Sequence, residues 1–241
     1  MLIKSEGIIL KSVKYSESSL ILDIFTKEIG LSTYIISGIR NTKSKSTEAN
    51  IQVGSILDLV LYDNENIKIN RIKEVKTNLQ YNKLIFEIKR FSVALFIIEV
   101  IGKSIKGREK NEQLYQLLKE SLIYIDSTDQ SLANFHLVTL CKISSLLGFG
   151  PENNLDKINI YFDLREGKFV DLLPHYSEYL NKNESEFFSQ ILSSELYNSH
   201  EIKLSKEIRN KILNDIIIYF EIHSGKIGRL KTLEVFQRIF N

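Results

Sequence analysis

Five short runs of β-branched and aliphatic residues, spaced almost evenly over the first 80 positions, constrain the fold more than any other feature of the sequence. They cover residues 5–14, 19–26, 31–37, 53–62 and 67–75. Turn-forming residues, including Gly30 and the polar cluster at 63–66, separate them. Short strands at such spacing are typical of a small sandwich or barrel, and the OB-fold is a closed solution with five strands. We therefore predict an OB-fold barrel over residues 1–80.

After about residue 80 the apolar period changes from two to three and four, the pattern of amphipathic helices. Three such stripes begin near Leu84, Leu114 and Leu132, and a Gly148-Phe149-Gly150-Pro151 segment should end the third helix. Residues 158–170 return to a β pattern, and further helices are expected over about 188–196, 208–220 and from about 229. The predicted fold class is α+β: a five-stranded OB-fold barrel, then a mostly helical domain over residues 81–241 with a short β-hairpin insertion near 155–175.

Composition places the chain among ordinary globular proteins, with 43% hydrophobic and 26% charged residues. The single cysteine, Cys141, excludes an internal disulfide and fits a reduced cytosol. We expect a cytoplasmic protein, because no stretch reaches the roughly 18 uncharged apolar residues of a membrane span. We also expect neither cofactor nor metal. Phosphate-binding, dinucleotide and serine-hydrolase motifs are absent from the sequence, and the four histidines lack metal-ligand spacing: His136, His175, His200 and His223.

One enzymatic pattern remains as an alternative. Asp58 lies in a predicted strand, and Glu74-Val75-Lys76 ends the next one. An acid followed by E-x-K on an adjacent strand is typical of metal-dependent nucleases, which hold a divalent ion beside a catalytic lysine. The triplet is common in lysine-rich chains, and residues 87–89 and 201–203 match it equally well. A third hypothesis is a protein-only interaction scaffold.

Local clusters of basic residues favour nucleic-acid binding instead, although the net charge is only +2. Cations in polar loops suit phosphate contacts, which are independent of sequence, and OB-folds add aromatic side chains on which bases stack. The candidate stacking residues are Tyr15, Phe25, Tyr34 and Tyr62, of which half should be core. The candidate basic residues are Lys11, Lys14, Arg40, Lys43, Lys45, Lys226, Arg229 and Lys231.

Taken in order, several segments resemble the RecO family of bacterial DNA-repair proteins. Residues 7–18, GIILKSVKYSES, are similar to that family's G-[IV]-[VIL]-L-x-x-x-x-Y-x-E-x. Residues 25–30, FTKEIG, resemble its F-T-x-x-x-G, and residues 37–40, SGIR, its K-G-[AV]-R. Residues 146–151, LLGFGP, look like L-L-G-x-x-P, and residues 228–234, GRLKTLE, resemble a closing basic-K-[ST]-L motif. The matches span nearly the whole chain, and the N-terminal set is the most specific.

The resemblance implies a non-catalytic recombination mediator with an N-terminal OB-fold. Such a protein binds single- and double-stranded DNA, anneals complementary strands and works with RecR. It also implies contact with the C-terminal tail of single-stranded-DNA-binding protein, help in loading RecA, and a nucleoid-associated location. By position, Lys11, Arg40, Lys43 and Lys45 are the residues it implies for DNA contact.

The sequence departs from the family at one point. Many members carry a four-cysteine zinc site after the L-L-G-x-x-P motif, whereas residues 155–174 contain no cysteine and only His175 lies nearby. A structural zinc needs four N or S ligands. We therefore expect the hairpin here to be held by packing of Ile160, Phe162, Phe169 and Val170.

Overall fold

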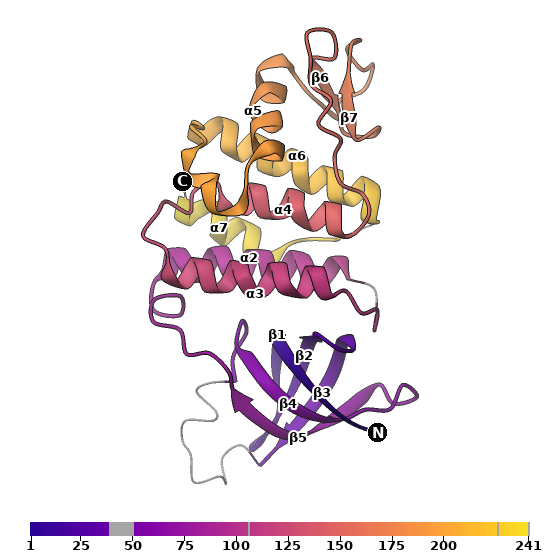
Figure 1. Ribbon diagram of the computed structural model, residues 1–241, viewed down its shortest axis with the longest axis vertical. Helices are drawn as coiled ribbons and strands as arrows, with labels where there is room; N and C mark the ends of the chain where they lie inside the picture. Colours follow the sequence, from indigo (N-terminus) through magenta and orange to yellow (C-terminus); the bar gives the residue numbers. More distant parts are fainter. Residues whose placement is uncertain (39–50, 106, 226, 241) are drawn as a thin grey trace. The chain divides into compact units, whose positions relative to one another are not determined.

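The computed structural model describes residues 1–38, 51–105, 107–225 and 227–240, and it opens with a closed barrel (Figure 1). The strand order around the barrel is β1-β2-β3-β5-β4, with β1 paired to both β2 and β4. Neighbours are antiparallel except β3 and β5, which are parallel. This is the topology of an OB-fold, so the predicted barrel and the α+β class are confirmed. The strands are β1 (Leu2–Ser16), β2 (Ser19–Thr26), β3 (Gly30–Ser37), β4 (Ile56–Tyr62) and β5 (Ile69–Thr77).

Alternation along each strand fills the barrel with apolar side chains. In β4, Leu57, Leu59 and Leu61 are buried, while Asp58 and Tyr62 are exposed. Burying each such leucine contributes about 1.5–3 kcal/mol. The barrel core consists of Ile9, Leu22, Ile24, Ile29, Tyr34, Ile36, Ile51, Leu57, Leu59 and Leu61.

Two glycines and a threonine of the N-terminal motifs have structural roles. A Cβ on Gly7 would lie 2.7 Å from both Ile24 and Leu59 in the core. Gly30 has a φ of +87°, and a Cβ there would lie 2.4 Å from the carbonyl oxygen of Glu109. The Thr26 hydroxyl donates to the carbonyl of Gly30 (3.0 Å) and accepts from the Ile29 amide (3.2 Å), closing the β2–β3 turn. These positions specify the barrel itself.

The chain forms two compact units that interleave along the sequence. The first contains residues 1–86 and 101–126, that is, the barrel, α3 (Glu112–Ser127) up to Asp126, and the end of α2 (Ile88–Ser104). The second contains residues 87–100 and 127–241. Within the described part of the chain, every helix is too short or too polar to span a bilayer.

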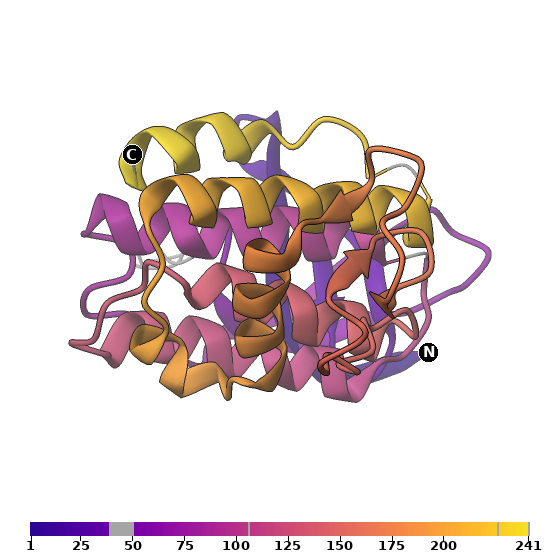
Figure 2. The ribbon, with the colours of Figure 1, turned by 90° about the horizontal axis from the view of Figure 1, so that it is seen from above.

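In the second unit α4 packs against α5, α6 and the 3-10 helix η1. The C-terminal α7 lies beside α6, where the Gln237 amide donates to Asn214 (3.2 Å) (Figure 2). The N-terminus of α7 is capped by Glu99 of α2, whose carboxylate accepts from the backbone amides of Lys231 (2.9 Å) and Thr232 (2.8 Å). The bounds are α4 (Phe135–Leu146), α5 (Lys182–Ser193), η1 (Leu196–Glu201), α6 (Lys206–Ser224) and α7 (Lys231–Phe240).

The predicted hairpin insertion is a three-stranded sheet, β7-β6-β8, built from β6 (Tyr161–Asp163), β7 (Lys168–Val170) and β8 (Tyr179–Leu180). Phe162 and Phe169 are buried and meet edge to face at 4.9 Å, and Ile160 and Val170 are half-buried. Asp163 adds polar contacts, accepting from the Arg165 amide (2.8 Å), the Glu166 amide (3.1 Å) and the Tyr176 hydroxyl.

Several predicted boundaries were wrong for local reasons. β4 begins at Ile56 rather than Val53, because Gln52 to Ser55 form a turn closed by the Ser55 amide (3.0 Å). Leu84 lies before α2, since its amide donates to the Asp126 carboxylate (2.8 Å) instead of a helical carbonyl. The strand β8 and the 3-10 helix η1 were not predicted from the pattern.

Candidate nucleic-acid interface

A row of outward-facing side chains crosses all five strands of the barrel. Cα partners follow one another from β1 to β2, β3, β5, β4 and back to the start of β1. We call this row the outer belt; its members are Val13, Ile21, Ile35, Arg71, Tyr62 and Leu2. Five of the six are apolar or aromatic, yet all are at least partly exposed. A continuous exposed apolar row on a sheet indicates a binding surface.

A second outward row runs beside the outer belt. It pairs Lys11 with Asp23, Asp23 with Thr33, and Thr33 with Ile69. The Thr33 hydroxyl donates to the Asp23 carboxylate (2.7 Å). Together with the outer belt, these residues cover the β2–β3 face, which OB-folds use for oligonucleotides.

The structure separates the predicted stacking residues as expected. Phe25 and Tyr34 are fully buried, whereas Tyr15 is 67% and Tyr62 is 48% exposed. Burial raises the pKa of the Tyr34 hydroxyl. Tyr15 lies at a β-bulge near the end of β1, and Tyr62 lies in the outer belt. Of these four candidates, Tyr15 and Tyr62 are therefore the two that a ligand can reach.

The predicted basic residues fall into three groups. Lys11 and Lys14 are exposed on β1, and Lys11 faces the same side as Val13. Arg229 and Lys231 are exposed at the start of α7, where Arg229 pairs with Glu234 (2.5 Å). The remaining four, Arg40, Lys43, Lys45 and Lys226, lie outside the described residues.

Sequence reasoning missed Arg71. This residue is exposed on β5, between Ile35 and Tyr62 in the outer belt. An isolated arginine in a strand carries no motif, and only the register shows that it joins an apolar row. An arginine between an isoleucine and a tyrosine can contact a phosphate or stack on a base.

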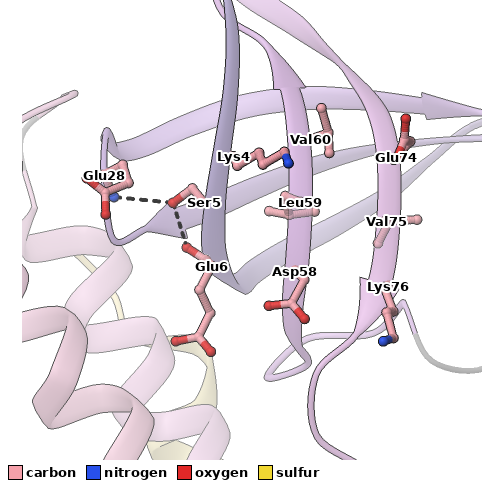
Figure 3. Close-up of a pocket in the computed structure, with 10 residues that line it drawn as sticks. All are labelled: Lys4, Ser5, Glu6, Glu28, Asp58, Leu59, Val60, Glu74, Val75 and Lys76. Atoms are coloured by element: carbon pink, nitrogen blue, oxygen red, sulfur yellow. Dashed lines mark hydrogen bonds between the residues drawn. The ribbon is translucent and has the colours of Figure 1, made fainter.

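A hollow of about 550 Å³ lies on the barrel away from the outer belt, over β1, β4 and β5 (Figure 3). We call it the acidic concavity, because four carboxylates outnumber two lysines in its lining. Three of these carboxylates are already paired with lysines, Glu6 with Lys119 (2.8 Å), Glu28 with Lys110 (3.5 Å) and Glu74 with Lys73 (3.4 Å), so size alone does not make it a DNA site. It is lined by Lys4, Ser5, Glu6, Glu28, Asp58, Leu59, Val60, Glu74, Val75 and Lys76.

The three residues of the nuclease hypothesis, Asp58, Glu74 and Lys76, all line this concavity, but their side chains do not meet at one point. In the register of β4 and β5, Asp58 lies across from Lys76, whereas Glu74 lies across from Val60, farther along the strands (Figure 3). The Asp58 carboxylate accepts from the Asn78 amide (2.8 Å), and Glu74 pairs with Lys73 (3.4 Å). Across the described ranges, no three His, Cys, Asp or Glu side chains are grouped to hold a metal ion. The geometry therefore lends the nuclease hypothesis no support.

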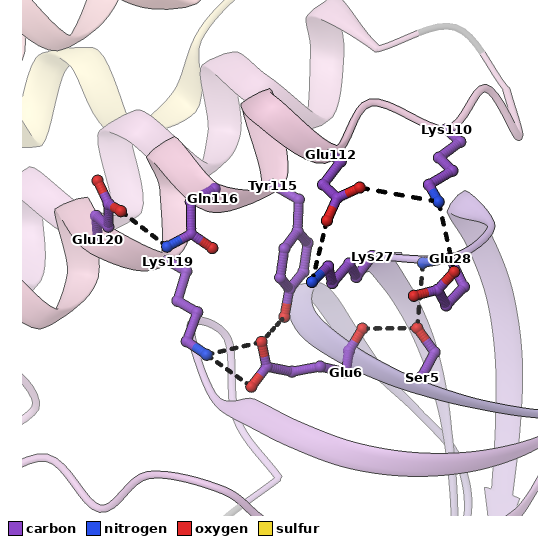
Figure 4. Close-up of polar contacts among 10 residues, drawn as sticks. All are labelled: Ser5, Glu6, Lys27, Glu28, Lys110, Glu112, Tyr115, Gln116, Lys119 and Glu120. Carbon is purple, nitrogen blue, oxygen red and sulfur yellow. Dashed lines mark hydrogen bonds and ion pairs between the residues drawn. The ribbon is translucent and has the colours of Figure 1, made fainter.

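Glu6, at the edge of the concavity, forms a structural ion pair with Lys119. Both of its carboxylate oxygens lie 2.8 Å from the Lys119 ammonium, and it accepts from the Tyr115 hydroxyl (3.0 Å) (Figure 4). It also accepts from the side-chain amide of Asn78 (2.9 Å). Burial, and then the negative charge of Glu6, raise the pKa of the Tyr115 hydroxyl. Tyr115 also meets Phe25 edge to face at 5.7 Å. This cluster fixes α3 to β1 and β2 within the first unit.

Further pKa shifts in the first unit come from ion pairing and burial. A hydrogen bond from Lys27 lowers the pKa of Glu112 and raises that of Lys27, and burial raises the pKa of Tyr81. The shifts of Lys27, Tyr34, Tyr81, Glu112 and Tyr115 each move the pKa away from neutrality. A general acid or base works best with a pKa near 7.

A closed five-stranded barrel with an exposed apolar row, continued by a helical unit, defines an OB-fold protein of mixed α+β class. Residues 1–81 match the family model described as "Recombination protein O N terminal", and residues 85–234 match "Recombination protein O C terminal". The chain belongs to the RecO family of DNA repair proteins.

Three curated relatives align with this chain from end to end. The DNA repair protein RecO of Christiangramia forsetii is 30% identical over 241 residues, that of Flavobacterium psychrophilum 29% over 242, and that of Azobacteroides pseudotrichonymphae 25% over 241. Each of these alignments covers 100% of this chain and 100% of the relative. The resemblance inferred from short motifs is therefore confirmed.

Proposed function

We propose that this protein is a non-catalytic recombination mediator that binds single- and double-stranded DNA and anneals complementary strands. The observation that carries the proposal is the outer belt, an exposed apolar row with Arg71 inside it and Lys11 beside it. An OB surface that combines cations with exposed rings suits single strands of any sequence. Annealing needs phosphates to be screened while bases stay free to pair, and lysines on an open surface achieve this by counterion release.

The proposal includes two sets of basic residues besides the belt. Arg40, Lys43 and Lys45 follow β3, and Lys226, Arg229 and Lys231 precede or begin α7. We propose that both sets contact phosphates, together with Lys11 and Lys14. With a domain division near residue 80, the barrel supplies the first set and the helical domain the second.

The proposed partners are those of the RecO family. They are RecR, the C-terminal tail of single-stranded-DNA-binding protein and, indirectly, RecA, in the cytoplasm at the nucleoid. Membership in a DNA-repair family supports partners of this general kind. No metal or cofactor takes part in the proposed activity.

The test is fluorescence anisotropy of labelled single-stranded DNA across a salt series, with EDTA present throughout. We expect binding without metal that weakens steeply with salt. Replacing Arg40, Lys43 and Lys45 by alanine should reduce the salt slope by up to about three phosphate contacts, at roughly 0.7 each.

The matched control replaces three exposed lysines of the second unit, Lys157, Lys182 and Lys206. It removes the same charge and should leave the slope nearly unchanged. An equal slope in both triple variants would exclude the residue 40–45 segment as a DNA contact. A wild-type protein that binds no DNA at low salt would leave the protein-only scaffold as the better account. In a parallel incubation with magnesium in place of EDTA, cutting of the oligonucleotide would favour the nuclease.

A further inference from the structure

A smaller cavity of about 310 Å³ opens where β4 ends and β5 begins. It is separate from the acidic concavity and shares no residue with it. Two members of the outer belt, Tyr62 and Arg71, line it as direct cross-strand partners. Ile67 and Ile69 add further apolar surface. The cavity is therefore continuous with the outer belt.

The connection between β4 and β5 that forms this cavity is held in place from inside. Asn70 is only 4% exposed; its side-chain oxygen accepts from the Asn64 amide (3.0 Å), and its NH₂ donates to the Asn64 carbonyl (3.1 Å). The Asp63 carboxylate accepts two bonds from Arg108 (2.5 and 2.6 Å). A cavity whose walls are fixed in this way loses little conformational entropy when a ligand enters.

The chemistry of the lining narrows the ligand. Tyr62, Ile67 and Ile69 are 48%, 49% and 43% exposed, which is unusual for three neighbouring apolar side chains. Arg71, the cross-strand partner of Tyr62 and two residues from Ile69 on β5, offers a planar cation that can stack on a ring or bind a phosphate. An apolar wall, an aromatic ring and a guanidinium together suit a flat heterocycle attached to an anionic backbone.

We propose that this cavity receives an unstacked nucleobase of single-stranded DNA, with the base lying on the ring of Tyr62 and the adjoining phosphate near Arg71. The inference rests on the proposed function, because it assumes that a strand follows the outer belt. It adds a base-binding subsite at one end of that surface. A duplex keeps its bases stacked and paired, so the subsite favours single strands.

The experiment compares two fluorescent oligonucleotides of equal length and charge, one carrying ordinary bases and one in which the central nucleotides are abasic. Affinity for both is measured by anisotropy across a salt series with the full chain. We expect the wild type to prefer the oligonucleotide with bases. Tyr62→Ala should weaken binding to that oligonucleotide by about fivefold to a hundredfold and leave binding to the abasic one unchanged. Tyr62→Phe should retain the preference, because it keeps the ring.

The matched control is Tyr197→Ala, since Tyr197 in η1 is 47% exposed, close to the value for Tyr62. It should behave as the wild type on both oligonucleotides, and thermal melting checks that each variant is folded. A Tyr62→Ala variant that weakens both oligonucleotides equally, or neither, overturns the base subsite. Steep salt dependence without any preference for bases also overturns it, while the proposed DNA-binding function stands. No binding of either oligonucleotide by the wild type overturns both.

Discussion

The barrel carries two outer surfaces that share strands β1, β4 and β5 but differ in charge and in how their side chains are engaged. In the acidic concavity Glu6 accepts hydrogen bonds from three side chains, and Asp58 accepts one from Asn78. In the outer belt and its flanking row the charged residues are mostly basic. The ion pairs among the described residues leave out Lys11, Lys14 and Arg71. The carboxylates of the larger hollow thus already hold partners, while the outer belt and its flanking row have cations available to a polyanion.

This difference teaches that hollow volume is a poor guide to a nucleic-acid site. A small ligand needs enclosure, but a DNA strand needs phosphate-neutralising charge and apolar faces along an extended path. The outer belt offers such a path across five strands. In the acidic concavity the carboxylates already hold lysines or Asn78, and it offers no comparable path.

The largest expected effect is on stability, at Glu6. Glu6→Ala leaves the Lys119 ammonium and the Tyr115 hydroxyl without their acceptor, so we expect a loss of about 3 kcal/mol in the free energy of unfolding. Urea denaturation followed by tyrosine fluorescence measures it. The control is Glu74→Ala, an exposed carboxylate of the same concavity, which should change stability by less than about 0.5 kcal/mol. Equal losses in the two variants would mean that Glu6 is not a structural ion pair.

The second effect concerns DNA affinity at the other surface. Lys11→Glu combined with Lys14→Glu places two negative charges where a phosphate path is proposed, so we expect single-stranded DNA to bind roughly tenfold to a hundredfold more weakly at moderate salt. Anisotropy measures the affinity. Lys182→Glu with Lys206→Glu, on exposed positions of the second unit, carries the same change in net charge. A similar loss in this control would show that overall charge, rather than the β1 surface, determines binding.

The third effect is a gain in DNA affinity on replacing Asp23, the acidic residue of the row beside the outer belt. Asp23→Asn removes the charge and keeps a side-chain oxygen that can accept from the Thr33 hydroxyl. We expect DNA affinity to rise by about twofold to threefold at low salt and the gain to shrink as salt screens it. Unfolding by urea should be unchanged. A gain that persists at high salt would argue against an electrostatic cause.

The barrel could be predicted from the sequence because alternation within a strand is a local signal. The β2 boundaries at Ser19 and Thr26 match the prediction, and Tyr34 joins the barrel core by the alternation of β3. Phe25 follows the buried Ile24, so its burial comes from the other face of β2, where it meets Tyr115 at 5.7 Å, and not from alternation. Leu84 shows the limit of periodicity. It fits the apolar stripe of α2, yet its amide is bound by Asp126, a residue 42 positions away, so the helix starts later.

The candidate site could be predicted only in part, because it depends on register between strands. Lys11, Lys14, Tyr15 and Tyr62 were named from residue type and position. Arg71 becomes a neighbour of Tyr62 and Ile35 only through pairing of β5 with β4 and β3, which no local pattern encodes. The partners of Glu6 were equally out of reach, since Lys119 lies 113 residues away.

The smallest expected effect tests whether a charge in the acidic concavity influences DNA binding at the outer belt. Glu74 faces the acidic concavity and is exposed, so Glu74→Gln removes one charge without a structural cost. If DNA follows the outer belt, affinity should rise by less than about 1.5-fold, well below the gain from Asp23→Asn, because Glu74 belongs to neither outward row and its charge is already paired with Lys73. The measurement is the same anisotropy titration at low salt, with magnesium and with EDTA. A gain equal to that of Asp23→Asn would place the strand over both surfaces. DNA binding or cutting that requires magnesium and is abolished by Glu74→Gln would instead support a nuclease site in the acidic concavity.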